Sequence, residues 1–335
     1  MKQDPHELSQ RRPPWLKNEQ IDQYLEKLNN LLAEADLDNP KTGDKPPKDL
    51  PLIYVVSAPR SGGTLLSQVL CKHLDVGYID NIAARFWLRP SAGINLSKSI
   101  RNFTNQDHIS FSSYYGRTKG PLEPNEFGYF WRHWFNLDTS INHKLSNRHL
   151  SNIDIFHLRA TLRNEILAAF GKAVVLKNPI CGLQANFLTK VHPKTLFVYI
   201  KRNPYDVAVS IMNARKTHYG DYSSWWSLKP SNYPDFINPL SPADEVFDQV
   251  IQCNKDLEHE LNKRHVNSIT LNYDELCRSP EMVLDHITAS ISAMNYSCTK
   301  LNLSTLQPFV DKSEISIPNE FKERLKKRAD ELEHK

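Results

Sequence analysis

The sequence predicts an α/β domain with a P-loop-type parallel β-sheet that is flanked by helices on both faces. An apolar run over residues 52–56 passes through a glycine turn into a helical pattern over residues 65–74. A second apolar run, over residues 195–201, also passes through a turn into a helical pattern. Further strand patterns over residues 173–177 and 268–272 are separated by helical patterns. This alternation is typical of a parallel sheet.

The chain has 335 residues, and we expect one large domain with additions at both ends. We place an N-terminal helical extension at residues 1–36, a linker at 37–51, the domain at 52–310 and a charged helical tail at 311–335. The extension has apolar residues at helical spacing, so it could pack on the body or form a homodimer. These residues are Ile21, Tyr24, Leu25, Leu28, Leu31 and Leu32.

The turn after the first strand, residues 57–64, has the build of a phosphate-binding loop. Gly62 and Gly63 allow backbone N–H groups to approach an anion, and the following helix presents its positive end. In the motif G-x-x-x-x-G-K-[ST], Gly63 stands where the nucleotide-binding lysine would be. The cation of this turn is Arg60, whose planar fork suits phosphate or sulfate oxygens. We therefore expect an anion other than a magnesium-bound triphosphate, with a tight corner that binds no ligand as the alternative.

A second turn with an arginine follows the strand at residues 195–201. Arg202 comes at the carboxyl end of that strand, where open α/β sheets bind their ligands. Pro204 suits the first position of the next helix, and Ser210 lies two helical turns further along. An ion pair between Arg202 and Asp206 is the alternative explanation of this turn. Two such turns in one chain favour one ligand that carries two phosphate groups.

Together these residues resemble the sulfotransferases that use 3′-phosphoadenosine 5′-phosphosulfate, in the carbohydrate- and tyrosylprotein-type branch, as a soluble member similar to those of bacteria. Four motifs occur in the order of that family, over residues 52–290. They are the 5′-phosphosulfate loop Pro59–Thr64, the turn Leu176–Pro179, the 3′-phosphate element Arg202–Pro204 with Ser210, and the late strand end Leu271–Leu276. The sequence departs from the family at Gly63, where a threonine or serine is usual. The hydrogen bond that a side-chain hydroxyl at this position would give to the phosphosulfate is therefore in doubt. The contacts from the backbone of the loop are not affected.

The resemblance implies the sulfotransferase fold and the transfer of a sulfuryl group to a hydroxyl of a carbohydrate or other small alcohol. The co-product would be adenosine 3′,5′-bisphosphate, and no metal ion is needed. Of the catalytic residues that the resemblance implies, Lys177 would stabilise the bridging oxygen and Arg60 would hold the phosphosulfate. The donor-binding residues that it implies are Arg60, Ser61, Gly62, Gly63, Thr64, Leu65, Arg202, Ser210 and Tyr273. The alternative for Lys177 is a lysine on the surface at the end of a strand. The alternative for Tyr273 is ordinary packing at a strand end.

The base that deprotonates the acceptor has several candidates. Asp80 lies about twenty residues after the loop arginine, where this branch of the family has an acidic residue, although a shift of one position would place Asn81 there. Glu123 and Glu126 precede an aromatic helical pattern. Glu126 is alternatively a carboxylate in the first turn of that helix, where it would interact with the helix dipole. His133, which lies off the apolar stripe of the same helix, is a fourth candidate.

An aromatic segment over residues 217–239 follows the helix of the second turn. Its tyrosine and tryptophan residues lie among Ser, Gly, Asp and Pro with little periodicity. Aromatic faces beside hydrogen-bonding groups suit sugars, so we interpret the segment as a lid over the acceptor. An irregular loop that is anchored by its own aromatic residues is the alternative.

Composition sets further limits on function. With 42 Lys and Arg against 38 Asp and Glu the net charge is +4, and no basic run indicates a nucleic-acid partner. The 5 cysteines are scattered without C-x-x-C spacing, which predicts reduced core thiols and no metal site. No segment has the length of a membrane span, and the first residues lack an apolar signal region. We therefore expect a cytoplasmic protein without a membrane span.

Two other functions fit the same fold class. A P-loop kinase acting on a small molecule is disfavoured by the missing lysine at Gly63 and by the pair Arg202 and Ser210. A non-catalytic nucleotide-binding relative would keep the loop but lack the base. Measuring which nucleotides bind distinguishes a kinase from a sulfotransferase. A sulfuryl-transfer assay distinguishes an active enzyme from a non-catalytic relative.

Overall fold

The computed structural model describes residues 11–16, 18–35, 50–104, 109–234, 241–301, 303–310 and 317–334. Within these ranges the chain forms a five-stranded sheet in which every paired neighbour is parallel. Its strands, in spatial order, are β2 (Gly77–Tyr78), β5 (Val174–Lys177), β1 (Leu52–Val56), β6 (Thr195–Lys201) and β7 (Ser268–Asn272). The predicted α/β class with a parallel sheet is confirmed.

Both faces of the sheet are covered, as the continuous apolar runs of its strands require. All five residues of β1 are buried. Leu52, Tyr54 and Val56 face one hydrophobic cluster, whereas Ile53 and Val55 face another. The strands at the centre therefore belong to a core that is closed on both sides.

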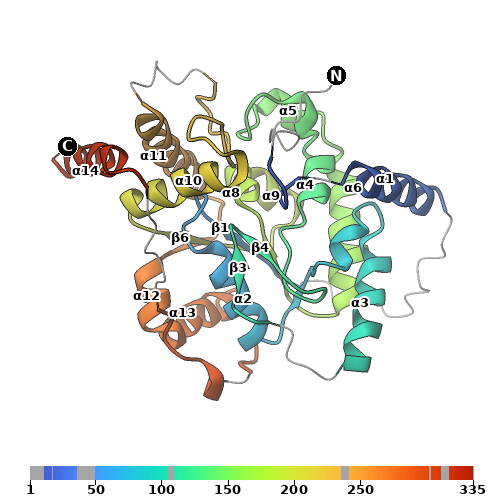
Figure 1. Cartoon of the computed structure of the whole chain (residues 1–335). Helices are drawn as coiled ribbons and strands as arrows, with labels where there is room; N and C mark the ends of the chain where they lie inside the picture. The colour runs from blue at the N-terminus through green and yellow to red at the C-terminus, as the bar shows by residue number, and fades with distance from the viewer. Residues whose placement is uncertain are drawn as a thin grey trace.

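Helices of different parts of the chain cover the two faces (Figure 1). The side chains of α2 (Gly63–His73) and α13 (Pro280–Ser292) pack on one face. The other face is covered by α4 (Gly128–Trp134), α8 (Pro179–Leu183), α9 (Ala185–Val191) and α11 (Pro242–Leu261). Helix α10 (Pro204–Tyr219) packs with α11 beside the sheet.

The remaining helical elements are mostly short. They are α1 (Glu19–Glu34), η2 (Ala83–Arg85), α3 (Pro90–Thr104), η3 (Leu137–Thr139), α5 (Asn147–Ser151), α6 (Ile155–Ala160), η4 (Thr161–Leu167), α7 (Ala168–Phe170), α12 (Tyr273–Arg278), η5 (Leu303–Thr305) and α14 (Asn319–Glu333). A small antiparallel hairpin, β3 (Ser113–Tyr114) and β4 (Arg117–Thr118), lies in front of the sheet (Figure 1).

Capping residues fix the starts of two helices, and the predicted first position of Pro204 is confirmed. Ser241 caps α11 by accepting a hydrogen bond from Asp244 N, and Pro242 takes the first helical position. Asn203 caps α10 in the same way, with Pro204 first. Strand β2 and the hairpin were not predicted, because two-residue strands have no detectable periodicity.

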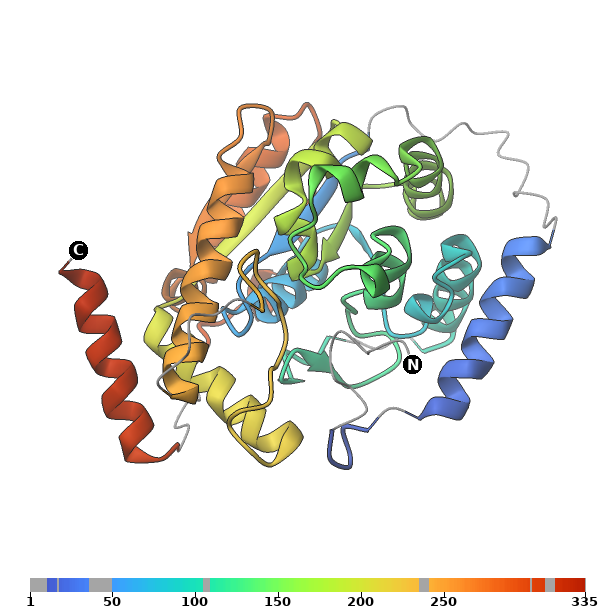
Figure 2. The ribbon, with the colours of Figure 1, turned by 90° about the horizontal axis from the view of Figure 1, so that it is seen from above.

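Helix α1 confirms the predicted N-terminal helix and lies along one flank of the molecule, opposite α14 (Figure 2). It packs on the body through Leu25 and Asn29, whose amide donates to Arg85 O at 2.8 Å. Ile21, Tyr24 and Leu31 are exposed by 51–67%. A homodimer through this helix stays a prediction, and most of the predicted linker, residues 37–49, lies outside the described residues.

Helix α14 is docked on the body, which corrects the expectation of a solvated tail. Leu325 is fully buried among the side chains of α10 and α11. Asp244 of α11 accepts hydrogen bonds from Arg324 at 2.9 Å and from Arg328 at 3.0 Å. The division of the chain at residues 36, 51 and 310 stays a prediction.

Candidate active site

The first anion loop lies at the switch point of the sheet. β1 is flanked by β5 on one side and β6 on the other, and the loop of residues 57–62 leaves its carboxyl end. Ligands of open α/β sheets bind at such a point. Gly62 precedes α2 with a φ of +94°, in the left-handed region. A Cβ at this position would lie 2.8 Å from Cε2 of the Tyr273 ring, so the loop requires glycine.

A hydrogen bond joins the two predicted anion turns. Nε of Arg60 donates to Oγ of Ser210, on α10, over 2.9 Å. Both side chains are largely shielded from solvent, and burial lowers the pKa of Arg60, although a guanidinium remains charged at neutral pH. The structure thus brings the loop of β1 and the helix after β6 to one place.

The late strand end reaches the same place. Tyr273 begins α12 directly after β7, and its ring packs against Gly62. The guanidinium of Arg202 stacks on this ring at 4.5 Å from the centroid. Arg60, Arg202, Ser210 and Tyr273 therefore form one continuous group. Ser61, Gly63, Thr64 and Leu65 follow Arg60 in the loop and the first turn of α2.

Lys177 and Glu126 form an ion pair beside this group. Lys177 ends β5, and its Nζ contacts Oε1 of Glu126. The Lys177 side chain is 10% exposed, whereas that of Glu126 is 41% exposed. A Cβ on Gly63 would lie 3.6 Å from Cε of Lys177, so the pair borders the phosphate loop. The amide of Asn178 donates to Glu126 O at 3.0 Å and holds the backbone of Glu126 in place.

Glu126 does not belong to the first turn of α4. Phe127 takes the cap position of that helix in a left-handed conformation, with a φ of +54°. Glu126 precedes the cap, and its side chain is directed to Lys177. Its interpretation as a carboxylate in the first helical turn is therefore wrong.

Asp80 and Glu123 are held away from solvent by hydrogen bonds. Asp80 is 1% exposed and accepts from the N–H groups of Ile82 and Ala83, from Ser97 Oγ and from Arg101 at 2.6 Å. Glu123, also 1% exposed, accepts from Gln68 at 3.0 Å and from Ser110 at 2.6 Å. Carboxylates with this many internal donors fix the loops around them.

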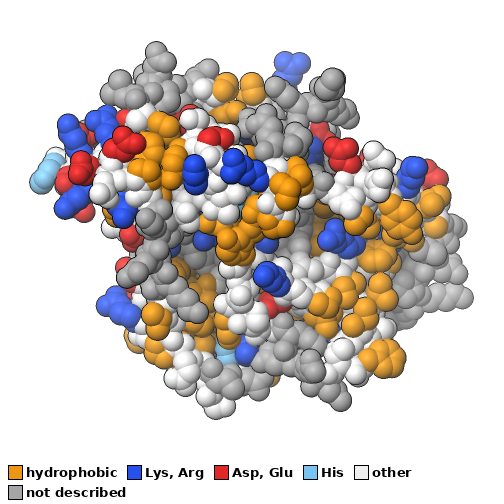
Figure 3. Space-filling model, viewed as in Figure 1, with side chains coloured by type: hydrophobic (Ala, Val, Ile, Leu, Met, Phe, Trp, Pro, Cys, Tyr) orange, Lys and Arg blue, Asp and Glu red, His pale blue; other side chains and the backbone are white. Residues whose placement is uncertain are grey.

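The β3–β4 hairpin covers the ion pair and the loop. Gly116, at its tip, has a φ of +84°. A Cβ there would lie 3.5 Å from Oε1 of Glu126 and 3.8 Å from Oγ1 of Thr64. Tyr115 lies over the guanidinium of Arg60 at 5.1 Å. This part of the site has Lys and Arg side chains among hydrophobic ones on the surface (Figure 3).

A profile of the sulfotransferase family matches residues 51–293, more than two thirds of the chain. The protein belongs to the sulfotransferase family. The matched range contains all the predicted donor-binding and catalytic residues, from Arg60 to Tyr273. No curated protein sequence is significantly similar to the chain.

Several solved structures are similar to this sulfotransferase. A sulfotransferase from Mycobacterium tuberculosis H37Rv is 14% identical, with a TM-score of 0.45, over 84% of this chain and 76% of that one. One from Mycobacterium avium is 15% identical, with a TM-score of 0.40, over 92% and 80%. One from Alicyclobacillus acidocaldarius is 15% identical, with a TM-score of 0.40, over 84% and 91%. At this identity no residue role is carried over from these proteins.

Several neighbours of the site in this sulfotransferase were not predicted. The hydroxyl of Tyr115 is bonded to Asn213 Nδ2 at 2.6 Å and to Thr217 Oγ1 at 3.0 Å. The sequence Tyr114-Tyr115-Gly116 could have indicated the hairpin, because an aromatic pair followed by glycine suits a hairpin. The ring of Trp15 stacks on Tyr114 at 4.9 Å. Nothing in the sequence indicates this contact, since the segment of Trp15 precedes the domain.

The aromatic segment is described as far as residue 234. Trp225 and Trp226 are buried, and Gln249 of α11 donates to the carbonyl of Trp226 at 2.9 Å. The guanidinium of Arg215 lies over the Trp225 ring at 5.4 Å. These contacts favour an anchored loop over the described range. The lid role stays a prediction, and residues 235–239 lie outside the described part of the chain.

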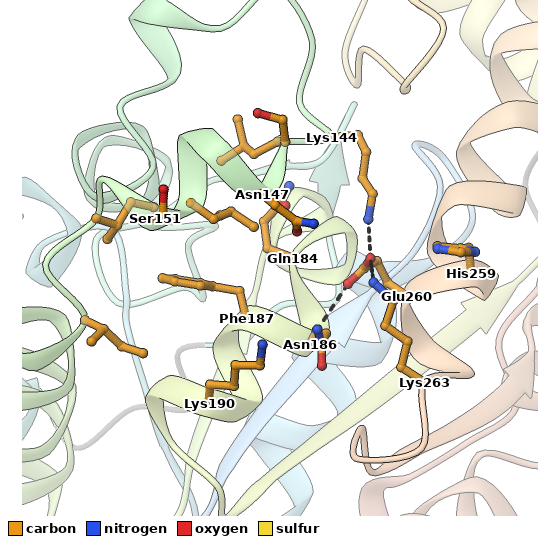
Figure 4. Close-up of a pocket in the computed structure, with 15 residues that line it drawn as sticks. Lys144, Asn147, Ser151, Gln184, Asn186, Phe187, Lys190, His259, Glu260 and Lys263 are labelled. Atoms are coloured by element: carbon orange, nitrogen blue, oxygen red, sulfur yellow. Dashed lines mark hydrogen bonds and ion pairs between the residues drawn. The ribbon is translucent and has the colours of Figure 1, made fainter.

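A pocket of about 740 Å³ lies beside α5, α9 and the end of α11 (Figure 4). On its wall Lys144 pairs with Glu260 at 2.5 Å, and the N–H of Asn186 donates to the same carboxylate at 3.3 Å. No predicted site residue is among the described residues that line it. We assign this pocket no part in the family's chemistry.

Three further properties concern the whole described chain. None of its helices is both long and apolar enough to cross a lipid bilayer. Across the same residues, no three His, Cys, Asp or Glu side chains gather as metal ligands. All five cysteines are free thiols, and four of them are buried, as the sequence predicted.

Proposed function

We propose that this protein transfers the sulfuryl group of 3′-phosphoadenosine 5′-phosphosulfate to a hydroxyl of a carbohydrate or other small alcohol. The observation that carries the proposal is the 2.9 Å hydrogen bond between Arg60 and Ser210. It joins a loop suited to a phosphosulfate to a turn suited to a second phosphate. A donor with phosphate groups at both its 3′ and 5′ positions matches two such turns at one sheet edge.

The residues present fit that donor. The loop amides, Arg60 and the start of α2 would hold the 5′-phosphosulfate. Arg202 and Ser210 would hold the 3′-phosphate, and Tyr273, which stacks with Arg202, would meet the adenine end. The backbone of the loop approaches Tyr273 so closely that only glycine fits at position 62. This close contact holds the Tyr273 ring beside the phosphate loop, within reach of a nucleotide bound there.

We propose Glu126 as the base and Lys177 as the cation at the departing oxygen. The carboxylate of Glu126 takes the proton of the acceptor hydroxyl, and the acceptor oxygen forms a bond to sulfur. The bond between sulfur and the bridging phosphate oxygen breaks, and its electron pair leaves on that oxygen. Lys177 stabilises this developing charge, while Arg60 keeps the group oriented.

Exposure to solvent favours Glu126 over Asp80 and Glu123 as the base. Glu126 is 41% exposed beside the phosphate loop, so an acceptor can reach it. Asp80 and Glu123 are saturated by internal donors and closed to solvent. A base must come within hydrogen-bond reach of the hydroxyl that it deprotonates.

We also propose a cytoplasmic location. All five cysteines are free, although four are buried in the core. Free thiols persist in reducing compartments, whereas secreted proteins of oxidising compartments tend to form disulfides.

Calorimetric titration with adenosine 3′,5′-bisphosphate and with ATP tests the donor. We expect binding of the bisphosphate without added magnesium, and at least tenfold weaker binding by Arg202→Ala, which loses a charge-assisted contact. Magnesium-dependent binding of ATP, with no binding of the bisphosphate, would instead support a kinase and overturn the proposal.

A further inference from the structure

Two arginines near the site, Arg11 and Arg117, have no carboxylate partner among the residues that the structure describes. Within the described residues, the contact recorded for Arg117 is with the ring of Trp15, at 5.4 Å, and Arg117 forms no ion pair. Nε of Arg11 is shielded from solvent and has no hydrogen-bond partner. A shielded cationic donor without a partner is costly, so a ligand that supplies one would be favoured.

Both arginines lie on the Glu126 side of the site. Arg117 directly follows Gly116, which borders the Glu126 carboxylate. The pKa of Arg117 is lowered, first by loss of solvent and then by the positive charge of Arg11, while the charge of Glu126 acts in the opposite direction. Arg117 therefore lies within electrostatic reach of both Arg11 and Glu126.

Aromatic contacts hold this arrangement together. Trp15 stacks on Tyr114 of the hairpin at 4.9 Å and contacts the ring of His218 at 4.4 Å. The backbone N–H of Arg12 donates to His218 O at 2.7 Å, which ties the N-terminal segment to the end of α10. The segment that carries Arg11 is thus held by packed neighbours, whereas Arg117 is exposed and rests against the Trp15 ring.

The donor does not account for these two charges. The proposed donor would use Ser210, which accepts from Arg60, and Arg202, which stacks on Tyr273. Arg117 instead belongs to the hairpin that borders Glu126, the base to which the acceptor would come. Among the described groups there, Glu126 is the carboxylate, and it is already paired with Lys177.

We propose that the acceptor carries an anionic group near its reactive hydroxyl, and that Arg11 and Arg117 bind this group. The inference rests on the proposed function and names its substrate class, a hydroxy compound with a carboxylate, sulfate or phosphate. Two guanidinium groups offer donors in the planar geometry that such anions accept. Binding would relieve the repulsion between the two cations and supply the partner that Arg11 Nε lacks.

Matched acceptor analogues test this inference. p-Nitrophenyl β-D-glucuronide and p-nitrophenyl β-D-glucoside differ in one carboxylate, and each is titrated calorimetrically into the protein saturated with adenosine 3′,5′-bisphosphate. We expect the glucuronide to bind at least about tenfold more tightly. Arg117→Gln and Arg11→Gln should each remove most of this difference without changing the affinity for the glucoside. Arg117→Lys should retain part of it.

Lys119→Gln is the control, because Lys119 is an exposed cation two residues from Arg117. It should leave the preference for the glucuronide intact. Equal binding of both compounds, no binding of the glucuronide, or a preference that survives both arginine substitutions would overturn the inference. Bisphosphate binding and sulfuryl transfer would be unaffected by that result, so the proposed function would stand. Loss of bisphosphate binding in the wild type would overturn both.

Discussion

The ion pair between Lys177 and Glu126 brings together the two residues that we propose as the cation at the departing oxygen and as the base. The pair borders the phosphate loop at Gly63, and one partner is shielded while the other is open to solvent. The sequence offered three carboxylates as the base without separating them. The hydrogen bonds in the structure distinguish Glu126 from the other two carboxylates. Asp80 and Glu123 accept from donors in other segments of the chain, and no sequence pattern indicates these contacts.

Glu126→Gln keeps the shape of the side chain and removes the base. We expect turnover to fall by about 10² to 10⁴, the usual contribution of a general base. The affinity for adenosine 3′,5′-bisphosphate should not change by more than about threefold. Turnover with labelled donor measures the effect. Glu258→Gln, which removes an exposed partner of Lys201, is the matched control and should keep full turnover. Equal rates for both variants would exclude Glu126 as the base.

Asp80→Asn should affect folding and not the reaction. It leaves Arg101 without its carboxylate partner and weakens the hydrogen bonds that Asp80 accepts from the N–H groups of Ile82 and Ala83. We expect a loss of about 3 to 5 kcal/mol in the free energy of unfolding, measured by urea denaturation. Asp75→Asn breaks an exposed pair with Lys172 and should cost about 1 kcal/mol or less. A stable Asp80→Asn protein that binds bisphosphate but does not turn over would point to Asp80 as the base.

His218 should make stability depend on pH. Burial, and then the charges of Arg11, Arg117 and Arg60, lower its pKa to about 4, although a hydrogen bond to Ala214 O acts in the opposite direction. The unfolded histidine has a pKa of about 6.5, so below that pH the unfolded chain binds a proton that the folded chain does not. This stabilising contribution is complete above pH 6.5 and is lost as the pH falls toward 4.

Thermal unfolding between pH 7.5 and 4.5 measures this effect. His218→Gln should reduce the pH slope of the unfolding free energy by up to about 1.4 kcal/mol per pH unit. The exposed His286 provides the control variant His286→Gln, whose slope should match that of the wild type. An unchanged slope in His218→Gln would mean that His218 titrates normally in the folded protein.

At the scale of elements, strands with continuous apolar runs could be predicted and short strands could not. The predicted β6 and β7 have the observed bounds, since both are bordered by turn residues. Helix starts at Asn203 and Ser241 carried capping signals. The hairpin has two residues in each strand, and its position over Thr64 and Glu126 depends on tertiary contacts alone. The sequence therefore predicted the strands that carry the two arginine turns better than the hairpin that covers them.

A charged helical tail was predicted over residues 311–335, but the docking of α14 was not, because its charged residues also suit a solvated helix. Leu325→Ala should lower the free energy of unfolding by about 2 to 5 kcal/mol, since Leu325 is fully buried. Leu332→Ala, at an exposed leucine of the same helix, should cost less than about 0.5 kcal/mol. Urea denaturation of both variants tests the docking. Equal small losses would show that α14 contributes little to stability.

At the scale of the whole molecule, the fold assembles one site from distant segments. The loop after β1, the ends of β5 and β6, and the start of α12 meet at the carboxyl edge of the sheet. The hairpin and the N-terminal segment close over that edge through Tyr115 and Trp15. The strand order around β1 explains why motifs so far apart in the sequence act together.

The transfer of ³⁵S from labelled 3′-phosphoadenosine 5′-phosphosulfate to a panel of hydroxylated acceptors tests this assignment most directly. We predict a labelled product with at least one carbohydrate or small alcohol, formed without added metal and reduced at least about 100-fold in Glu126→Gln. Binding of the bisphosphate without labelled product from any acceptor would contradict it, and would indicate a nucleotide-binding relative that does not catalyse transfer.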